Sequence, residues 1–146
     1  MIIKLDLAQK AFIVASGKLL LVRKSSDDPE NPGLWEVPGG RMKLDEDIDE
    51  HIQREVLEEV GLSIAPGEPF HMWQWVMKSR DGDGQVKVVA VARVCHTDAT
   101  ALDFAGREDD DYLDEAEWVP LDGVSNYNLI PSLKPAMAKF LASQTA

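Results

Sequence analysis

Three glutamates near the middle of the chain, Glu55, Glu58 and Glu59, are the residues whose types and spacing could do chemistry. They stand at i, i+3 and i+4, so on a helix they share one surface. Such crowded carboxylates repel one another and add nothing to helix stability, whereas Mg²⁺ and Mn²⁺ prefer oxygen-rich clusters of this kind. The spacing alone leaves two interpretations open, a metal site and a solvated acidic face.

The residues around this triad favour the metal site. Gly39 and Gly40 come shortly before it and can bring bare backbone close to a metal or a phosphate. A cation held there would neutralise the carboxylates, grip a pyrophosphate oxygen and lower the pKa of a bound water. On the other flank, Arg54 can pair with Glu46 or with Glu50, which would stiffen the unit of loop and helix.

A helix over residues 48–60 is expected to carry the three glutamates. One apolar stripe with a spacing of four residues is expected to pack it on a sheet: Ile48, Ile52, Val56 and Val60. Gly61 supplies a residue that can end the helix in the left-handed conformation. Asp47 and Glu50 resemble a capping box at its start.

The remaining elements predict an α/β chain. Strands are expected over residues 2–7, 11–15, 19–23, 34–37, 70–78, 86–96 and 117–121, and a second helix over 132–143. Residues 16–18 form a hairpin turn, 38–40 a loop, and 103–115 an acidic loop. This order of elements indicates a mixed sheet with helices on both sides.

Length, charge and cysteine content limit the function classes. A chain of 146 residues is the size of one domain, so we expect a single domain over residues 1–146. The net charge of −11 argues against long nucleic acid and anionic membrane as partners, and the apolar runs are too short to cross a bilayer. The only cysteine, Cys95, permits no intrachain disulfide. With no signal-peptide pattern at the N-terminus, a cytoplasmic location is expected.

Residues 40–62 match a family motif. They consist of Gly40, five residues, Glu46, seven residues and then the run from Arg54 to Leu62, which reads REVLEEVGL. This pattern resembles the complete Nudix box of the Nudix (MutT-like) hydrolases. The resemblance implies an α/β/α sandwich around a mixed β-sheet. It also implies hydrolysis, with Mg²⁺ or Mn²⁺, of a nucleoside diphosphate linked to another moiety.

The same resemblance assigns roles by position. Glu55, Glu58 and Glu59 would be catalytic metal ligands, and the Gly40 carbonyl would be a further ligand. Glu46 and Arg54 would form a structural ion pair that supports catalysis. The general base is left open between Glu59 and the second acidic patch, whose candidates are Glu108, Asp109–Asp111 and Glu115.

The substrate is less defined by the sequence. Arg23 and Lys24 follow the second hairpin strand, near where such enzymes bind phosphate. Trp73 and Trp75 stand two apart, so on a strand they share one face and could either stack on a base or pack in the core.

A nucleoside triphosphate, modified or not, is the expected substrate. An ADP-ribose or nucleotide-sugar hydrolase is the alternative enzyme within the family. The non-enzymatic alternative is a catalytically silent nucleotide-binding sensor. The oligomeric state is open, with a homodimer among the states considered.

Overall fold

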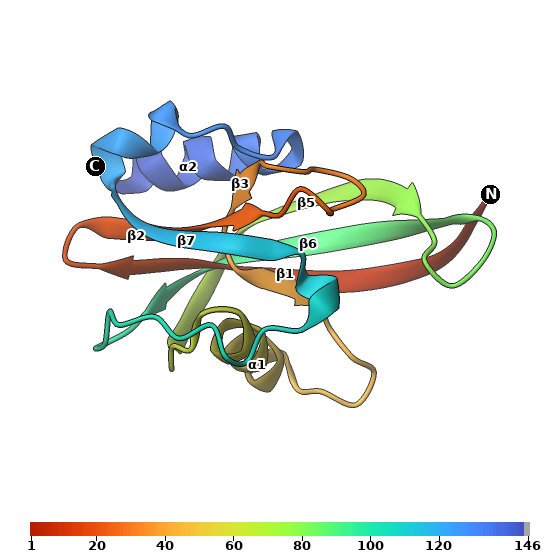
Figure 1. The fold of residues 1–146 in the computed structure, drawn as a ribbon, viewed down its shortest axis with the longest axis horizontal. Helices are drawn as coiled ribbons and strands as arrows, with labels where there is room; N and C mark the ends of the chain where they lie inside the picture. Colours follow the sequence, from red (N-terminus) through yellow and green to blue (C-terminus); the bar gives the residue numbers. More distant parts are fainter. Residues whose placement is uncertain (145–146) are drawn as a thin grey trace.

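A seven-stranded mixed sheet lies between two helices in the computed structural model, which describes residues 1–144 apart from the side chain of Asp110. Helix α1 (Ile48–Val60) covers one face and α2 (Lys134–Gln144) the other (Figure 1). The predicted α/β/α sandwich is therefore confirmed. Residues 145–146, the end of the expected domain, lie outside the described residues.

The sheet runs in the order β3-β2-β1-β6-β5, with β4 on β1 and β7 on β2. The strands are β1 (Ile2–Ala15), β2 (Lys18–Lys24), β3 (Trp35–Glu36), β4 (Gly39–Arg41), β5 (Ala65–Lys78), β6 (Gln85–His96) and β7 (Leu113–Pro120). Three 3₁₀-helices, η1 (Asp109–Asp111), η2 (Leu121–Asn126) and η3 (Pro131–Leu133), lie in the second half of the chain. β1 and β6 are parallel, and the other pairs are antiparallel.

Strand alternation divides the apolar residues between two cores. Phe12, Leu19 and Leu21 point to one side and pack with α2 through Phe140. Their neighbours Ala11, Ile13, Leu20 and Val22 point to the other side and pack with Ile52, Val56 and Val60 of α1. Helix α1 is thereby fixed against the sheet along its second half.

The predicted apolar stripe of α1 is wrong at one position. Ile52, Val56 and Val60 are buried as expected, but Ile48 is 58% exposed. Its angular position is right, yet it is the first residue of the helix and lies one turn before the apolar cluster. The groups at that turn are polar, since the Gln9 amide donates to the Ile48 carbonyl.

Of the two caps predicted for α1, the structure contains the C-terminal one and lacks the N-terminal one. Gly61 has φ of 73° and its N–H donates to the Leu57 carbonyl, as expected for a left-handed cap. The predicted capping box is wrong, because the side chain of Asp47 makes no capping hydrogen bond.

Several strand boundaries differ from the prediction because pairing overrides local signals. β1 is one continuous strand, not two, since β6 pairs with it from Ile2 to Val14. Residues 39–41, expected as a loop, form β4 on the free edge of β1. β5 begins at Ala65 despite Pro66, Gly67 and Pro69, with irregular pairing at these positions.

No helix among the described residues is both long enough and apolar enough to span a membrane.

Candidate active site

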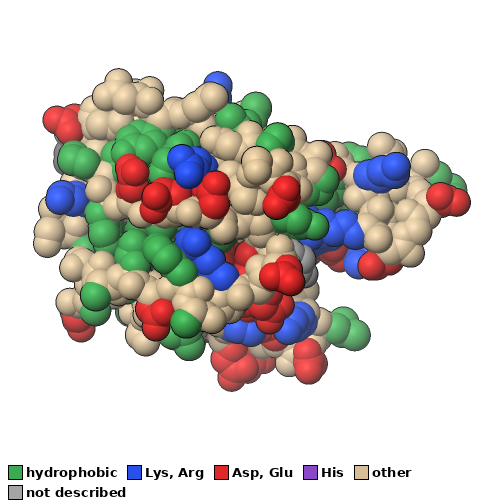
Figure 2. Space-filling model, in the orientation of Figure 1, with side chains coloured by type: hydrophobic (Ala, Val, Ile, Leu, Met, Phe, Trp, Pro, Cys, Tyr) green, Lys and Arg blue, Asp and Glu red, His purple; other side chains and the backbone are tan. Residues whose placement is uncertain are grey.

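A cavity of about 510 Å³ opens between α1, β4, β5 and the η1 turn. The far end of β5 contributes Trp75, Met77 and, beyond it, Arg80 to its wall. In Figure 2 the start of β1 and the β5–β6 loop project as an arm at the right, and charged side chains of both signs gather where the arm joins the body. The cavity is therefore lined by apolar side chains of β5 on one side and by charged side chains, including the glutamates of α1, elsewhere.

Carboxylates from two distant segments meet in this cavity. Oxygens of Glu55, Glu59 and Asp111 lie within 4.8 Å of one another. Glu55 and Glu59 are 7% and 5% exposed, and Glu58 lines the same cavity. These residues are oxygen donors of the kind that Mg²⁺ and Mn²⁺ bind, so the donor set fits a divalent cation.

The clustering changes the acidity of the α1 glutamates. Burial, followed by the charge of Glu55, raises the pKa of Glu59 well above its usual range. Burial also raises the pKa of Glu55. Burial and the neighbouring Asp111 raise the pKa of Glu58 to about 7. The repulsion inferred from the sequence is thus present, and a cation would relieve it.

Metal-free protein is expected to lose stability as pH rises from about 4.5 to about 7, and less so in a Glu58→Gln variant. The folded state holds the Glu58 proton up to pH about 7, whereas the ordinary value is 4.5. Folded protein then binds more protons than unfolded protein in this window, so the free energy of unfolding falls as pH rises.

Urea unfolding in EDTA across this window measures the effect. His51, whose pKa burial lowers, acts in the opposite direction below its ordinary value of 6.5. The comparison with Glu58→Gln separates the two contributions, because His51 is common to both proteins. Equal pH slopes in the two proteins would show that Glu58 is not crowded.

The glycines before α1 approach the carboxylates as closely as the sequence suggested. A Cβ atom on Gly40 would lie 2.7 Å from the carboxyl group of Glu55, so no side chain fits there. The Gly39 N–H donates to Glu59 Oε1 at 3.3 Å. β4 holds both glycines in place through its pairing with Gln9 and Lys10 of β1.

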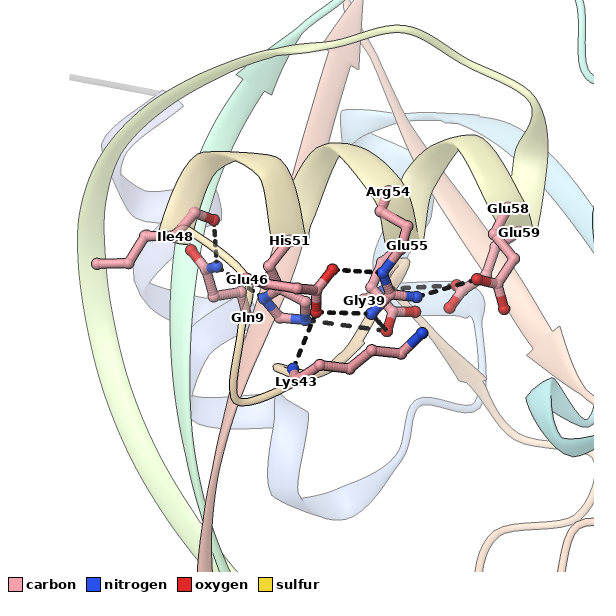
Figure 3. Close-up of polar contacts among 10 residues, drawn as sticks. All are labelled: Gln9, Gly39, Lys43, Glu46, Ile48, His51, Arg54, Glu55, Glu58 and Glu59. Carbon is pink, nitrogen blue, oxygen red and sulfur yellow. Dashed lines mark hydrogen bonds and ion pairs between the residues drawn. The ribbon is translucent and has the colours of Figure 1, made fainter.

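Arg54 joins the loop to the helix (Figure 3). Its Nε and Nη2 donate to the two oxygens of Glu46 at 2.5 and 3.0 Å, Nη1 to Glu58 Oε2 at 3.0 Å, and Nη2 to Glu55 Oε1 at 3.1 Å. The hydrogen bond from Arg54 lowers the pKa of Glu46 to about 2. Of the two acid partners considered from the sequence, Arg54 pairs with Glu46 and not with Glu50.

The sequence interpretation missed a buried cation. Lys10 Nζ lies 2.5 Å from Glu36 Oε1, and Lys24 Nζ lies 3.5 Å from Glu36 Oε2. Burial opposes the charge on Lys10, but Glu36 outweighs it and raises the Lys10 pKa. Glu55 and Glu59 act on Lys10 in the same direction. Two positive charges therefore lie beside the carboxylates. The sequence signal that could have predicted the buried cation is Lys10 itself, a lysine within a largely apolar strand segment.

The predicted substrate residues divide into two groups. Lys24, Trp73 and Trp75 line the cavity, and the two indole centroids are 6.4 Å apart on one face of β5. Arg23 does not line the cavity. It pairs with Asp114 at 2.8 Å and lies over the ring of Trp35.

The second acidic patch divides in the same way. Glu108 and Asp111 line the cavity. Asp109 borders a separate depression, and Glu115 lies on β7, where its Oε1 accepts from the backbone N–H of Ala116. Of the five general-base candidates in this patch, Asp111 alone joins the cluster of Glu55 and Glu59 among the side chains that the structure describes.

Known proteins share parts of this sequence. The CTP pyrophosphohydrolase of Escherichia coli K12 is 28% identical over 137 residues, which cover 93% of this chain and 91% of that protein. The m7GpppN-mRNA hydrolase NUDT17 of Danio rerio is 44% identical over 54 residues, 37% of this chain and 18% of its own length. The phosphatase NudJ of E. coli K12 is 36% identical over 62 residues, 42% of this chain and 39% of its own. The chain thus aligns with less than half the length of the last two relatives.

Solved structures share the fold. A MutT protein from Methanosarcina mazei Go1 superposes with a TM-score of 0.75 at 23% identity, covering 97% of this chain and 96% of that chain. The NUDIX domain of Shewanella oneidensis NrtR, complexed with ADP ribose, gives 0.68 at 20% identity over 96% and 87%. The family model for the NUDIX domain matches residues 6–144. This chain therefore belongs to the Nudix (MutT-like) hydrolase family.

Proposed function

We propose that this chain is a Mg²⁺-dependent Nudix pyrophosphohydrolase that cleaves a nucleoside triphosphate, modified or not, as a single domain over residues 1–146 in the cytoplasm. The observation that carries the proposal is the meeting of Glu55, Glu59 and Asp111 oxygens within 4.8 Å in a cavity of about 510 Å³. Carboxylates so close and so buried are costly without a cation.

Roles follow from position in the cavity. Glu55, Glu58, Glu59 and the Gly40 carbonyl would hold Mg²⁺ or Mn²⁺. The cation would supply charge neutralisation at the pyrophosphate and a water of lowered pKa. Asp111 would add a fourth carboxylate, and either Asp111 or Glu59 would accept the proton of the attacking water.

Other residues would position the substrate. Arg54 would fix Glu46 and Glu55, and so hold the loop against the helix. Lys24 and Lys10, which also line the cavity, would face the phosphates. Trp73 and Trp75 offer flat apolar surfaces for a base. Arg23 pairs with Asp114 and would stabilise the end of β2 without contacting the substrate.

Two alternatives to a nucleoside triphosphatase, a different substrate and a sensor without activity, are also to be tested. One relative, aligned over 93% of this chain, is named a CTP pyrophosphohydrolase, which supports a nucleoside triphosphate. A fold neighbour was crystallised with ADP ribose, which favours ADP-ribose or a nucleotide sugar as the second candidate. A silent nucleotide sensor is disfavoured, because binding alone needs fewer carboxylates.

A nucleotide screen with product identification is the decisive experiment. We expect hydrolysis of at least one nucleoside triphosphate with Mg²⁺ or Mn²⁺, and binding of the cation in calorimetry. The screen should include CTP, ADP-ribose and nucleotide sugars, and should separate release of phosphate from release of pyrophosphate. Binding of nucleotide and cation without turnover of any compound would favour the sensor. No cation binding, with or without nucleotide, would contradict the proposal.

A further inference from the structure

A chain of polar side chains, three of them buried and the first, Asp49, exposed, lies behind the carboxylate cluster. It runs from Asp49 through Arg93 of β6 and Gln9 of β1 to His51 of α1. His51 is 0% exposed and Gln9 is 1% exposed. Figure 3 shows His51 between Gln9 and Glu55, on the side of α1 that faces the sheet.

The orientation of the Gln9 amide is fixed from both ends. The Arg93 guanidinium can only donate, and its Nη1 lies 3.2 Å from Gln9 Oε1 and 2.7 Å from Asp49 Oδ1. The Ile48 carbonyl can only accept, and it lies 2.7 Å from Gln9 Nε2. Both contacts require the same amide orientation, with oxygen toward Arg93 and nitrogen toward the helix.

This orientation assigns the proton on the His51 ring. Gln9 Nε2 also lies 2.8 Å from His51 Nδ1, so Nδ1 is the acceptor in this contact. A ring nitrogen that accepts carries no hydrogen, and the ring is then neutral with its proton on Nε2. The tautomer of His51 on α1 is therefore set by Gln9, a residue of strand β1.

The His51 Nε2 atom is directed at the carboxylate cluster. It lies 3.8 Å from Glu55 Oε1 and has no partner at full hydrogen-bond geometry among the described residues. The backbone groups of Gly40 and Arg41, which also interact with the ring, are the competing acceptors. A buried N–H left unpaired is costly. A shift of about 1 Å would bring the two atoms to hydrogen-bond distance.

Glu55 then has donors on one oxygen only. Arg54 Nη2 already donates to Glu55 Oε1 at 3.1 Å, on the same atom that His51 faces. We propose that His51 is a positioning residue, whose Nε2–H, aligned by Gln9 and Arg93, orients Glu55 so that Oε2 is free for the cation. The cation part of this inference rests on the proposed function, and the tautomer does not.

The tautomer can be measured directly in the metal-free protein. A long-range ¹H–¹⁵N correlation spectrum of the histidine side chains separates the two neutral forms and the charged form. His51 is assigned by the signal that disappears in His51→Gln, with His71 and His96 retained. We expect the neutral Nε2–H form in the wild type at pH 8. An Nδ1–H or a charged ring would overturn the inference without affecting the proposed hydrolysis.

Two matched substitutions test the positioning role through Mn²⁺ affinity. Asn at position 51 offers an oxygen near the Nδ1 position, which can accept from Gln9, but no donor that reaches Glu55. Gln reaches farther and can donate to Glu55. Loss of a residue that orients a metal ligand typically costs 10–100-fold in metal affinity. We expect a loss of that size in His51→Asn and an affinity close to wild type in His51→Gln.

The outcomes separate positioning from packing. Equal losses in both variants would indicate a packing role and would overturn the inference, as would no loss in either. Thermal unfolding of both variants shows whether each is folded. Absence of Mn²⁺ binding by the wild type would contradict the proposed function together with this inference, whereas the wrong tautomer would contradict this inference alone.

Discussion

Replacing Glu59 by Gln is expected to lower turnover by roughly 10²–10⁴-fold while the fold survives, the range typical for removing one electrostatic or acid–base group. Glu59 is 5% exposed and accepts from the Gly39 N–H, so its carboxylate is fixed in place at the edge of the core. Gln keeps the shape and an acceptor oxygen but removes the charge that would hold the cation.

Steady-state hydrolysis of the best nucleotide from the screen measures this effect. Glu50→Gln is the matched control, because Glu50 belongs to the same helix, is exposed and lies outside the cavity. Metal-free Glu59→Gln is expected to be at least as stable as wild type, since the substitution relieves carboxylate crowding. A rate near wild type would remove Glu59 from the mechanism.

The second large effect is expected from Arg54→Ala, which should lower activity by about 10–100-fold and stability by about 1–2 kcal/mol. Arg54 is the cation shared by Glu46, Glu55 and Glu58. Without it, the loop before α1 loses its connection to the helix and Glu55 loses a donor. Activity and urea unfolding should therefore change together.

Arg54→Lys separates charge from geometry. Lysine keeps the positive charge but cannot bind both oxygens of Glu46 while it also donates to Glu55 and Glu58. We expect intermediate stability and an activity close to that of Arg54→Ala. Wild-type activity and melting temperature in Arg54→Ala would mean that Arg54 is only a surface charge.

Local sequence predicted the parts of the site that lie within one element and its loop. The bounds of α1 and the shared surface of its glutamates depend on helical spacing alone. For Arg54, spacing left Glu46 and Glu50 open, and the family resemblance indicated Glu46, which the structure pairs with it. Mg²⁺ or Mn²⁺ as the cofactor stays a prediction, as do the individual roles of the site residues.

The missed features depend on residues that are far apart in the chain. Lys10 pairs with Glu36 only because β1 and β3 lie close together. Asp111 was a candidate from the sequence, but its place beside Glu55 and Glu59 depends on where the η1 turn lies. Gln9 contacts His51 only because β1 runs beneath the start of α1. β4 was missed because a Pro–Gly–Gly segment is typical of a loop, and only the open edge of β1 makes it a strand. The exposure of Ile48 was missed because the period of the apolar residues predicts which way a side chain points. It does not predict how far along the helix the apolar surface of the sheet extends.

The central pairing of β1 with β6 has a consequence for how the chain folds. The first strand to be synthesised must wait for residues 85–96 before it gains its long parallel partner, and β2 must wait for β7. Contacts between such distant segments slow folding, because a long loop must close before they contribute stability. While the chain is still emerging, the open edges of β1 and β2 are exposed to other chains, so synthesis is the stage at which this protein is most prone to aggregate.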